Sequence, residues 1–380
     1  MKTAPEILVD LVSIPSVSSM TNRPVIEYVL SYLDEQKWNI ALYPYHDNAG
    51  TEKINFIARP RNVSERNTEL ALVCHTDTVP FESDWEEAVH PVVRDGKVYG
   101  RGSCDVKGFL ACALEAFTRI DLLRLSKPLA IVLTADEEIG CIGAKHLASI
   151  GAIKSRYMII GEPTGLAPVS AGKGYALAEI VVRGKEAHSA FPQEGHSAIR
   201  DAARILERLD SVQRALASRI DARFDPPFTT LNVGLIQGGT AKNIVPGECR
   251  LTLEWRPIPG QDPEWAASLI GQQLADLRSE VPGFTAEIER RRSDPPFASG
   301  GEHLTSLLET LTKRSSITVA FGTEASHLAP LASDVIVFGP GDMTLAHRTG
   351  EFVAVHEMQD CVAYLSAIIE RVCGDQSKYS

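Results

Sequence analysis

The sequence lacks paired cysteine motifs. Its seven cysteines are scattered and odd in number, and none stands in a CxxC pair. This pattern argues against a disulfide framework and against a cysteine zinc site, and it favours the reduced thiols of a cytoplasmic protein. No apolar run approaches the roughly 20 residues needed to span a bilayer. Glu6 and Asp10 interrupt the first apolar stretch, which indicates a helix rather than a signal peptide.

Basic residues are also scarce, because 38 lysines and arginines stand against 49 aspartates and glutamates, giving a net charge of −11. A nucleic acid or an anionic membrane surface would be met by a basic face, so we expect neither as a partner. No GxGxxG or GxxxxGK[ST] follows a predicted strand, which leaves a nucleotide-binding α/β protein a weak alternative. The 380 residues, 44% of them hydrophobic, are enough for two domains with a large core.

Strand and helix patterns alternate in the first part of the chain and again in the last. This order predicts an α/β fold in which a mostly parallel central sheet is flanked by helices. The expected helices are 4–12, 24–36, 107–119, 143–150, 301–314 and 357–372, and the expected strands are 54–58, 70–74, 129–134, 157–160 and 335–338.

The pattern changes between these two parts. Four strands and two helices follow the order strand–helix–strand–strand–helix–strand, which is typical of a ferredoxin-like α+β layer. The strands are expected at 176–182, 230–236, 249–255 and 284–290, and the helices at 198–209 and 264–279. We therefore predict a catalytic domain from residues 1–174 and 292–380, with an inserted domain at 175–291.

Three consecutive acids follow the apolar run 129–134, within the stretch LAIVLTADEEIGCIG. They are Asp136, Glu137 and Glu138, and the run itself predicts a strand buried on both faces. In open α/β sheets ligands collect beyond the carboxyl ends of the strands, so these acids stand where such a site would lie. Taken alone, a solvated acidic turn is the more common interpretation of this stretch.

Other predicted segments deliver similar residues. His75 ends the strand at 70–74, Glu162 follows the strand at 157–160, and His347 lies in the glycine-rich loop after the last strand. Asp77 follows His75 and could accept the second ring N–H of a metal-bound imidazole. Asp105 precedes the helix at 107–119, where a helix N-cap is the simpler interpretation.

Oxygen and nitrogen ligands without thiolate suit Zn²⁺, with Co²⁺ or Mn²⁺ also open. The five candidates His75, Asp105, Glu138, Glu162 and His347 are too many for one tetrahedral catalytic ion. They suit two divalent ions that share a bridging carboxylate, and Glu137 is then available as a base. The residues alone do not assign ligands to each ion.

The motifs HTDTVP, GRGSCDVKG, TADEEIG, GEPT and HSAFPQEG, followed by GPG and a histidine, occur in this order along nearly the whole chain. Together they resemble the di-zinc aminoacylase / acetylornithine deacetylase / succinyl-diaminopimelate desuccinylase / glutamate carboxypeptidase family, and within it the acetylornithine deacetylase branch most. Cys104 departs from the family pattern, where alanine or another small residue is expected.

The resemblance implies roles for the candidate residues. His75 and Glu162 would bind one ion, Glu138 and His347 the other, and Asp105 would bridge them. Glu137 would be the general base and Asp77 would orient His75. The peptide between Asp105 and Val106 would be cis.

The resemblance also implies roles for the inserted domain, which would be a lid and a dimerisation domain of a homodimer. His188 would reach the active site of a partner subunit and donate to the oxyanion, although a lone loop histidine is more often structural. Asn243 would bind the oxyanion or the substrate. Arg256 would clamp the α-carboxylate of the substrate, with a surface salt bridge as the alternative.

The expected activity is metal-dependent hydrolysis of the amide bond of an N-acyl amino acid, most simply N-acetylornithine to ornithine and acetate in arginine biosynthesis. Alternatives inside the family are an N-acetylcitrulline deacetylase, a broad aminoacylase, a desuccinylase and a dipeptidase. The alternative outside it is a catalytically silent binding protein. All six residues whose loss would favour that alternative are present: His75, Asp105, Glu137, Glu138, Glu162 and His347.

Overall fold

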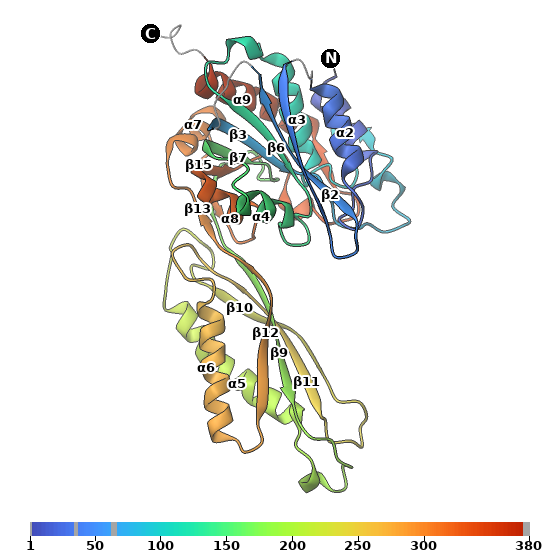
Figure 1. The fold of residues 1–380 in the computed structure, drawn as a ribbon, viewed down its shortest axis with the longest axis vertical. Helices are drawn as coiled ribbons and strands as arrows, with labels where there is room; N and C mark the ends of the chain where they lie inside the picture. The colour runs from blue at the N-terminus through green and yellow to red at the C-terminus, as the bar shows by residue number, and fades with distance from the viewer. Residues whose placement is uncertain (1, 34–36, 62–66, 375–380) are drawn as a thin grey trace. The chain divides into compact units, whose positions relative to one another are not determined.

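The computed structural model of the protein describes residues 2–33, 37–61 and 67–374. The chain forms two compact units (Figure 1). Unit 1 comprises Met1–Ser170, Ala298–Ile317 and Thr323–Ser380, and unit 2 comprises Ala171–Phe297 and Thr318–Gly322. The chain passes between the units four times: within β8 (Val169–Gly172), β13 (Phe297–Ala298) and β14 (Ile317–Val319), and between Gly322 and Thr323.

Unit 1 is built on a nine-stranded sheet in the order β1-β2-β6-β3-β7-β15-β8-β13, with β14 paired to β8. Its central strands β6, β3, β7 and β15 run parallel, whereas β1, β2 and β8 pair antiparallel. Every residue of β6 is buried, as expected for a strand covered on both faces. The strands are β1 (Trp38–His46), β2 (Glu52–Pro60), β3 (Thr68–His75), β6 (Leu129–Thr134), β7 (Ser155–Ile160) and β15 (Ala332–Val337).

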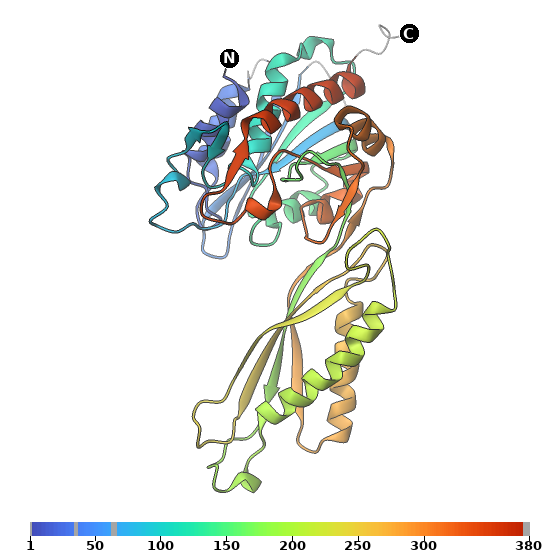
Figure 2. The same ribbon diagram turned by 180° about the vertical axis from the view of Figure 1, so that it is seen from behind.

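Helices cover both faces of this sheet. On one face α3 packs against α1 and α9, and Figure 2 shows α9 and α3 in front of the strands. On the other face α4 packs against α8 and β2. The helices are α1 (Ala4–Val12), α2 (Arg23–Tyr32), α3 (Lys107–Arg119), α4 (Ile142–Ser149), α7 (His303–Thr312), α8 (Ala325–Leu328) and α9 (Val355–Cys373).

A small antiparallel sheet in the order β16-β5-β4 completes unit 1. Its strands are β4 (Val92–Arg94), β5 (Lys97–Tyr99) and β16 (Phe352–Ala354). Because β16 pairs with β5, the segment that follows His347 lies beside the segment that precedes Asp105. This pairing brings together parts of the chain that are far apart in sequence.

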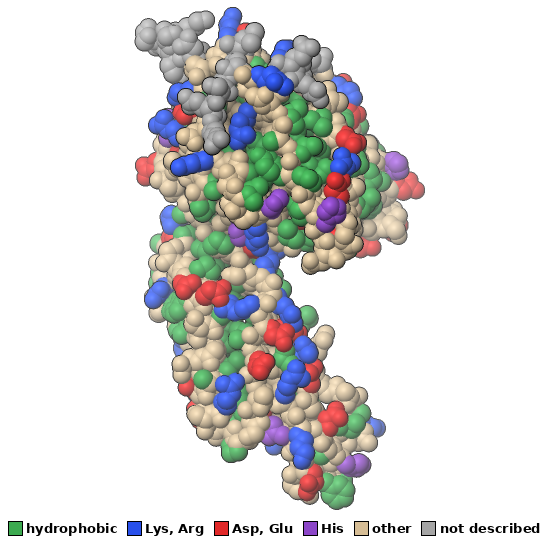
Figure 3. All heavy atoms as spheres, in the orientation of Figure 1, with side chains coloured by type: hydrophobic (Ala, Val, Ile, Leu, Met, Phe, Trp, Pro, Cys, Tyr) green, Lys and Arg blue, Asp and Glu red, His purple; other side chains and the backbone are tan. Residues whose placement is uncertain are grey.

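Unit 2 contains a four-stranded antiparallel sheet in the order β10-β11-β9-β12, against which two helices pack. This is the strand order of a ferredoxin-like layer. Lysine and arginine side chains are intermixed with acidic ones over its visible face (Figure 3), so no field of one sign covers that face. The elements are β9 (Tyr175–Arg183), α5 (Ala198–Ala217), β10 (Thr230–Gly238), β11 (Glu248–Arg256), α6 (Trp265–Glu280) and β12 (Thr285–Asp294).

The structure confirms the predicted fold class, a mostly parallel α/β sheet with a separate antiparallel layer. Helix 107–119 and strand 129–134 have the predicted ends. The helix predicted at 24–36 ends at Tyr32, and residues 34–36 lie outside the described residues. The predicted domain boundaries 174/175 and 291/292 differ from the unit boundaries 170/171 and 297/298, and residues 318–322 belong to unit 2.

All seven cysteines are buried thiols. Among the described residues, no helix is both long and apolar enough to cross a membrane.

Candidate metal centre and active site

The candidate residues meet at one edge of the parallel sheet. His75 is the last residue of β3, the pair Glu137 and Glu138 follows β6, and Glu162 follows β7. These strands are parallel neighbours, with His75 in register with Thr134, so their carboxyl ends share an edge.

Two groups of potential ligand atoms share Asp105. The side chains of His75, Asp105 and Glu162 bring one ligand atom each within 4.8 Å of one another, and so do those of Asp105, Glu138 and His347. His75 Nε2 lies 3.1 Å from Asp105 Oδ1, whereas His347 Nε2 lies 3.2 Å from Asp105 Oδ2. Each oxygen of this carboxylate therefore faces a different histidine.

This donor set fits divalent cations. Imidazole nitrogens and carboxylate oxygens are ligands of Zn²⁺, and the five residues contain no thiolate. His75, Asp105 and Glu162 are at most 5% exposed, so their charges need partners. One carboxylate shared between two three-residue groups is the arrangement expected for a pair of ions.

The pKa values show how strongly the site favours positive charge. Burial raises the pKa of Glu138 and raises that of Glu162 well above its usual value. Burial opposes ionisation of Asp105 as well, but His347 and His75 hold its pKa below the usual value. Hydrogen bonds to Asp105 and Glu138 raise the pKa of His347 to about 10. Neighbouring negative charge also raises the pKa values of these two glutamates and of the imidazole groups, and a site of this kind favours a bound cation.

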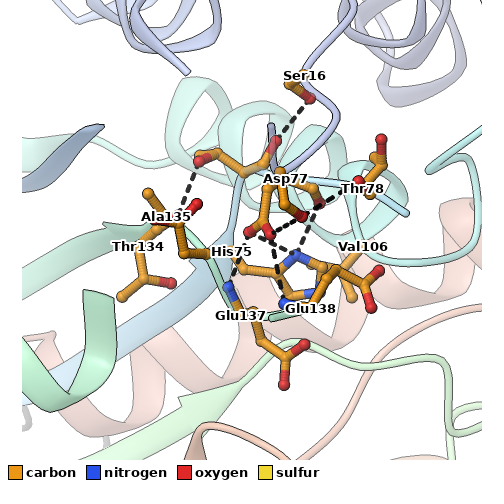
Figure 4. Close-up of polar contacts among 12 residues, drawn as sticks. Ser16, His75, Asp77, Thr78, Val106, Thr134, Ala135, Glu137 and Glu138 are labelled. Carbon is orange, nitrogen blue, oxygen red and sulfur yellow. Dashed lines mark hydrogen bonds and ion pairs between the residues drawn. The ribbon is translucent and has the colours of Figure 1, made fainter. Parts of the chain in front are cut away.

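Asp77 contacts both His75 and the acidic turn, as Figure 4 shows. The Nδ1 of His75 lies 3.0 Å from the backbone oxygen of Asp77 and 3.7 Å from its carboxylate oxygen. The carboxylate itself accepts hydrogen bonds from the backbone N–H groups of Glu137 (3.0 Å) and Glu138 (3.3 Å). The sequence predicted that the Asp77 carboxylate would accept from His75. In the structure the closer acceptor is the Asp77 backbone oxygen, and the carboxylate binds the backbone of the acidic turn instead.

Glu137 is placed beside the ligands without belonging to either group of potential ligands. Burial raises the pKa of its carboxyl to about 8. The Cys141 thiol donates to its Oε1 across 3.3 Å. A carboxyl with a pKa near neutrality can accept and return a proton at physiological pH.

Asp105 lies in the turn before α3, but it does not cap this helix as the simpler interpretation of the sequence expected. The N-cap of α3 is Val106, and no side chain caps this helix, so Asp105 is not its N-cap. The peptide between Asp105 and Val106 is cis, as the family resemblance implied. The Cys104 thiol donates to the backbone oxygen of Asp342, 3.3 Å away.

The three candidates of the inserted domain all lie in unit 2. The loops of His188 and Asn243 pair with each other, because the Ser189 N–H donates to the Asn243 backbone oxygen at 3.0 Å. The Ala190 N–H donates to Nδ1 of the exposed His188, which leaves Nε2 to carry the ring proton. Arg256 is half-buried at the end of β11, with its guanidinium 4.4 Å from the centre of the Tyr175 ring.

Several buried polar residues around the site were not predicted. Ser18 donates to the Asp77 carboxylate at 2.7 Å, and Lys53 forms a fully buried ion pair with Asp136 at 2.8 Å. Glu324 is completely buried, and neither of its oxygens accepts a normal hydrogen bond from the described residues. Burial raises the pKa of Glu324 to about 7. None of the motifs quoted from the sequence contains Ser18, Lys53 or Glu324.

The chain is similar to known metallohydrolases. Residues 71–371 match the model of peptidase family M20/M25/M40. Acetylornithine deacetylase from Myxococcus xanthus is 43% identical over 97% of both chains. Acetylornithine deacetylase from Proteus mirabilis (strain HI4320) is 31% identical over 97% of this chain and 96% of that one.

Solved structures share the fold. An M20 family metallo-carboxypeptidase from Sulfolobus solfataricus has a TM-score of 0.75 at 18% identity, over 97% of this chain and 99% of that one. A dinuclear metal-binding M20 peptidase from Bacillus subtilis has a TM-score of 0.66 at 14% identity, over 97% of this chain and 98% of that one.

Proposed function

This chain belongs to peptidase family M20/M25/M40, and from that premise we propose that it hydrolyses N-acetylornithine to ornithine and acetate. The observation that carries the proposal is the shared Asp105, whose two oxygens face His75 and His347 at the ends of parallel strands. The similarity to the acetylornithine deacetylase of Myxococcus xanthus supports this substrate over other N-acyl amino acids.

Two divalent ions would bind in this centre. His75 and Glu162 would hold one, Glu138 and His347 the other, and Asp105 would bridge them. Zn²⁺ suits the donor set and Co²⁺ is also suited. When bound, such ions polarise a carbonyl and lower the pKa of water.

Glu137 would carry the proton through the reaction. It takes a proton from the attacking water and then gives it to the nitrogen of the leaving amine, so that it acts first as base and then as acid. Without metal ions, burial raises the pKa of its carboxyl to about 8, which favours the protonated form needed for the acid role. Asp77 would hold the backbone of this residue in place through its N–H.

Unit 2 would supply substrate contacts. The Nε2–H of His188 is oriented to donate, because Nδ1 already accepts from the Ala190 N–H, and a donor of this kind stabilises an oxyanion. Asn243, in the loop paired with that of His188, would bind the same oxyanion or the substrate. Arg256 would bind the α-carboxylate in a bidentate manner, for which its planar group is suited.

We further propose a homodimer through unit 2. β10 is an edge strand of its sheet, and Leu235 and Ile236 on it are 58% and 53% exposed. An exposed apolar edge favours pairing with a second copy. Sedimentation equilibrium should give a dimer mass for the wild type and a monomer mass for Ile236→Lys. A monomeric wild type would refute this assembly.

We place the reaction in the cytosol, since seven buried thiols suit a reducing compartment.

The decisive experiment is a substrate panel on enzyme reconstituted with Zn²⁺ or Co²⁺, with bound metal counted. The panel contains N-acetylornithine, N-acetylcitrulline, N-acetylmethionine, N-succinyl-diaminopimelate and a dipeptide. We expect two ions per chain and the highest kcat/KM with N-acetylornithine. A higher value with another member would reassign the substrate, and hydrolysis of none would refute the activity.

A further inference from the structure

We infer that Glu351 is a positioning residue for Asp105. The buried carboxylate of Glu351 binds the backbone of the turn that contains Asp105, and this contact orients the Asp105 carboxylate toward both groups of ligand atoms. The inference rests on the proposed function, because it assigns to Asp105 the bridging role. No sequence motif pointed to Glu351, which lies four positions after His347 and immediately before β16.

Both oxygens of Glu351 are engaged at this turn. Oε1 accepts hydrogen bonds from the backbone N–H groups of Cys104 (2.9 Å) and Asp105 (3.2 Å). Oε2 forms an ion pair with Nη1 of Arg101 at 2.6 Å. The Glu351 side chain is 0% exposed and that of Arg101 is 5% exposed, so water does not compete for these contacts.

Stability alone is a weak reason for burying this ion pair. A buried pair costs desolvation of both ions, and replacing it with apolar groups of similar volume is often neutral or stabilising. An apolar side chain could not accept hydrogen bonds from the two N–H groups at 104 and 105, however, and would leave them without this acceptor. The carboxylate is therefore better explained by the geometry of the turn.

The same segment of the chain acts on Asp105 from two sides. His347 contacts the side chain of Asp105 at Oδ2, whereas Glu351 binds its backbone N–H. The Glu351 backbone oxygen also accepts from the Gly100 N–H at 3.0 Å, which holds the two segments together. A substitution of Glu351 should therefore alter metal binding, because it alters the orientation of Asp105.

The chain offers a matched control for this test. Glu115, on α3, also accepts from a backbone N–H, that of Ala4, and also pairs with an arginine, Arg119. Its hydrogen bond with Ala4 joins α3 to α1, its pair with Arg119 lies within α3, and neither involves a proposed ligand. Glu351→Leu and Glu115→Leu thus remove the same kinds of interaction, although Arg119 is 52% exposed where Arg101 is 5% exposed, and only the first acts on the turn of Asp105.

The test measures Co²⁺ binding by calorimetry, the visible spectrum of the Co²⁺ protein, and kcat and KM separately. We expect Glu351→Leu to weaken Co²⁺ binding by about 10–100-fold, the range typical of residues that orient metal ligands. Its Co²⁺ spectrum should change, and kcat should fall more than KM rises. Glu115→Leu should lower the melting temperature and leave Co²⁺ affinity and spectrum unchanged.

Glu351→Gln keeps an oxygen acceptor but loses the charge, so its Co²⁺ affinity and spectrum should lie between those of the wild type and Glu351→Leu. If Glu351→Leu does not fold, the Glu351→Gln protein decides: we expect a Co²⁺ affinity a few-fold below wild type and an altered spectrum. The inference is overturned if the folded Glu351→Leu protein has wild-type Co²⁺ affinity and spectrum. If Glu351→Leu does not fold, the same result in Glu351→Gln overturns it. Either result leaves the proposed function intact. A wild type that binds no Co²⁺ would overturn both.

Discussion

The Asp77 carboxylate accepts a hydrogen bond from the backbone N–H of Glu137 at 3.0 Å. The two residues are 60 positions apart and follow neighbouring parallel strands, β3 and β6. Since the Asp77 backbone oxygen also lies 3.0 Å from His75 Nδ1, one residue connects the proposed base to a proposed ligand. Asp77 itself is 3% exposed, so this connection is shielded from water.

Asp77→Asn should lower kcat with little loss of metal. The change removes one carboxylate oxygen, so the turn of Glu137 and Glu138 loses part of a charge-assisted contact. Hydrogen bonds to charged groups contribute about 1.5–3 kcal/mol, which corresponds to a drop of roughly 10–100-fold. Steady-state kinetics with metal analysis measure this. Ser18→Ala, which removes only the hydroxyl that donates to Asp77, should have a smaller effect; an equal effect would contradict the role of the turn.

Glu137→Gln should keep both ions and lose most of the rate. The amide cannot take a proton from water, and general acid–base groups contribute about 10²–10⁴-fold. The variant Glu138→Gln is the comparison, because it should lose metal as well as rate. Counting metal by atomic emission beside kcat separates the two. Retained activity in Glu137→Gln would rule out this residue as the base.

His188→Ala should fold normally and turn over slowly. Loss of one oxyanion donor costs about 10²–10³-fold in kcat. The ring is exposed and its contacts, with the Ala190 N–H and the Phe191 ring, are local, so the melting temperature should change little. Measuring kcat alongside circular dichroism tests both statements, and wild-type turnover would remove His188 from the reaction.

Without added metal the protein should lose stability as pH rises from about 5 to 8. Burial raises the pKa of Glu137 to about 8 and that of Glu324 to about 7, from a usual value of 4.5. Folding thus favours their protonated forms; the gain is full below about pH 4.5 and disappears as pH passes the raised values. Melting temperatures across this range are the measurement. Glu324→Gln should show a shallower decline, and a rise with pH would contradict the assignment.

Lys53→Met should destabilise the protein by about 3–5 kcal/mol, because it leaves the buried charge of Asp136 without its partner. Lys53 and Asp136 are 1% and 0% exposed, so solvent does not replace the lost ion. Adding Asp136→Asn, which keeps an acceptor for the Tyr45 hydroxyl, should restore part of the loss. Urea unfolding of the single and double variants gives both values. Equal stability of Lys53→Met and wild type would show that the pair contributes nothing.

The sequence predicted His75, Glu138 and Glu162 because each lies at or just after the end of a strand that is apolar enough to be recognised, whereas Asp105 precedes a helix. His75, Glu138 and Glu162 need only the parallel order of their strands to share an edge. β1 was missed, because its exposed and half-buried residues and Pro44 do not form an apolar run. This edge strand is stabilised by its pairing with β2, and that pairing cannot be predicted from the residues of β1 alone.

The contacts of Asp77 and Glu351 could not be predicted for a different reason. Asp77 was recognised, but its carboxylate binds the backbone of residues about 60 positions away. Glu351 binds backbone groups about 250 positions away and follows no strand. Backbone N–H groups carry no side-chain signature, so a carboxylate that binds them looks like any other acid in the sequence.

The two proposed metal-binding histidines differ in their contact with solvent: the His347 side chain is 51% exposed and that of His75 is 1% exposed. Exchange with the medium should therefore be faster in the half of the centre that contains His347. The cation bound there would be the first to be stripped by a chelator. A chain carrying a single cation, retained by His75 and Glu162, would then be an intermediate of inactivation.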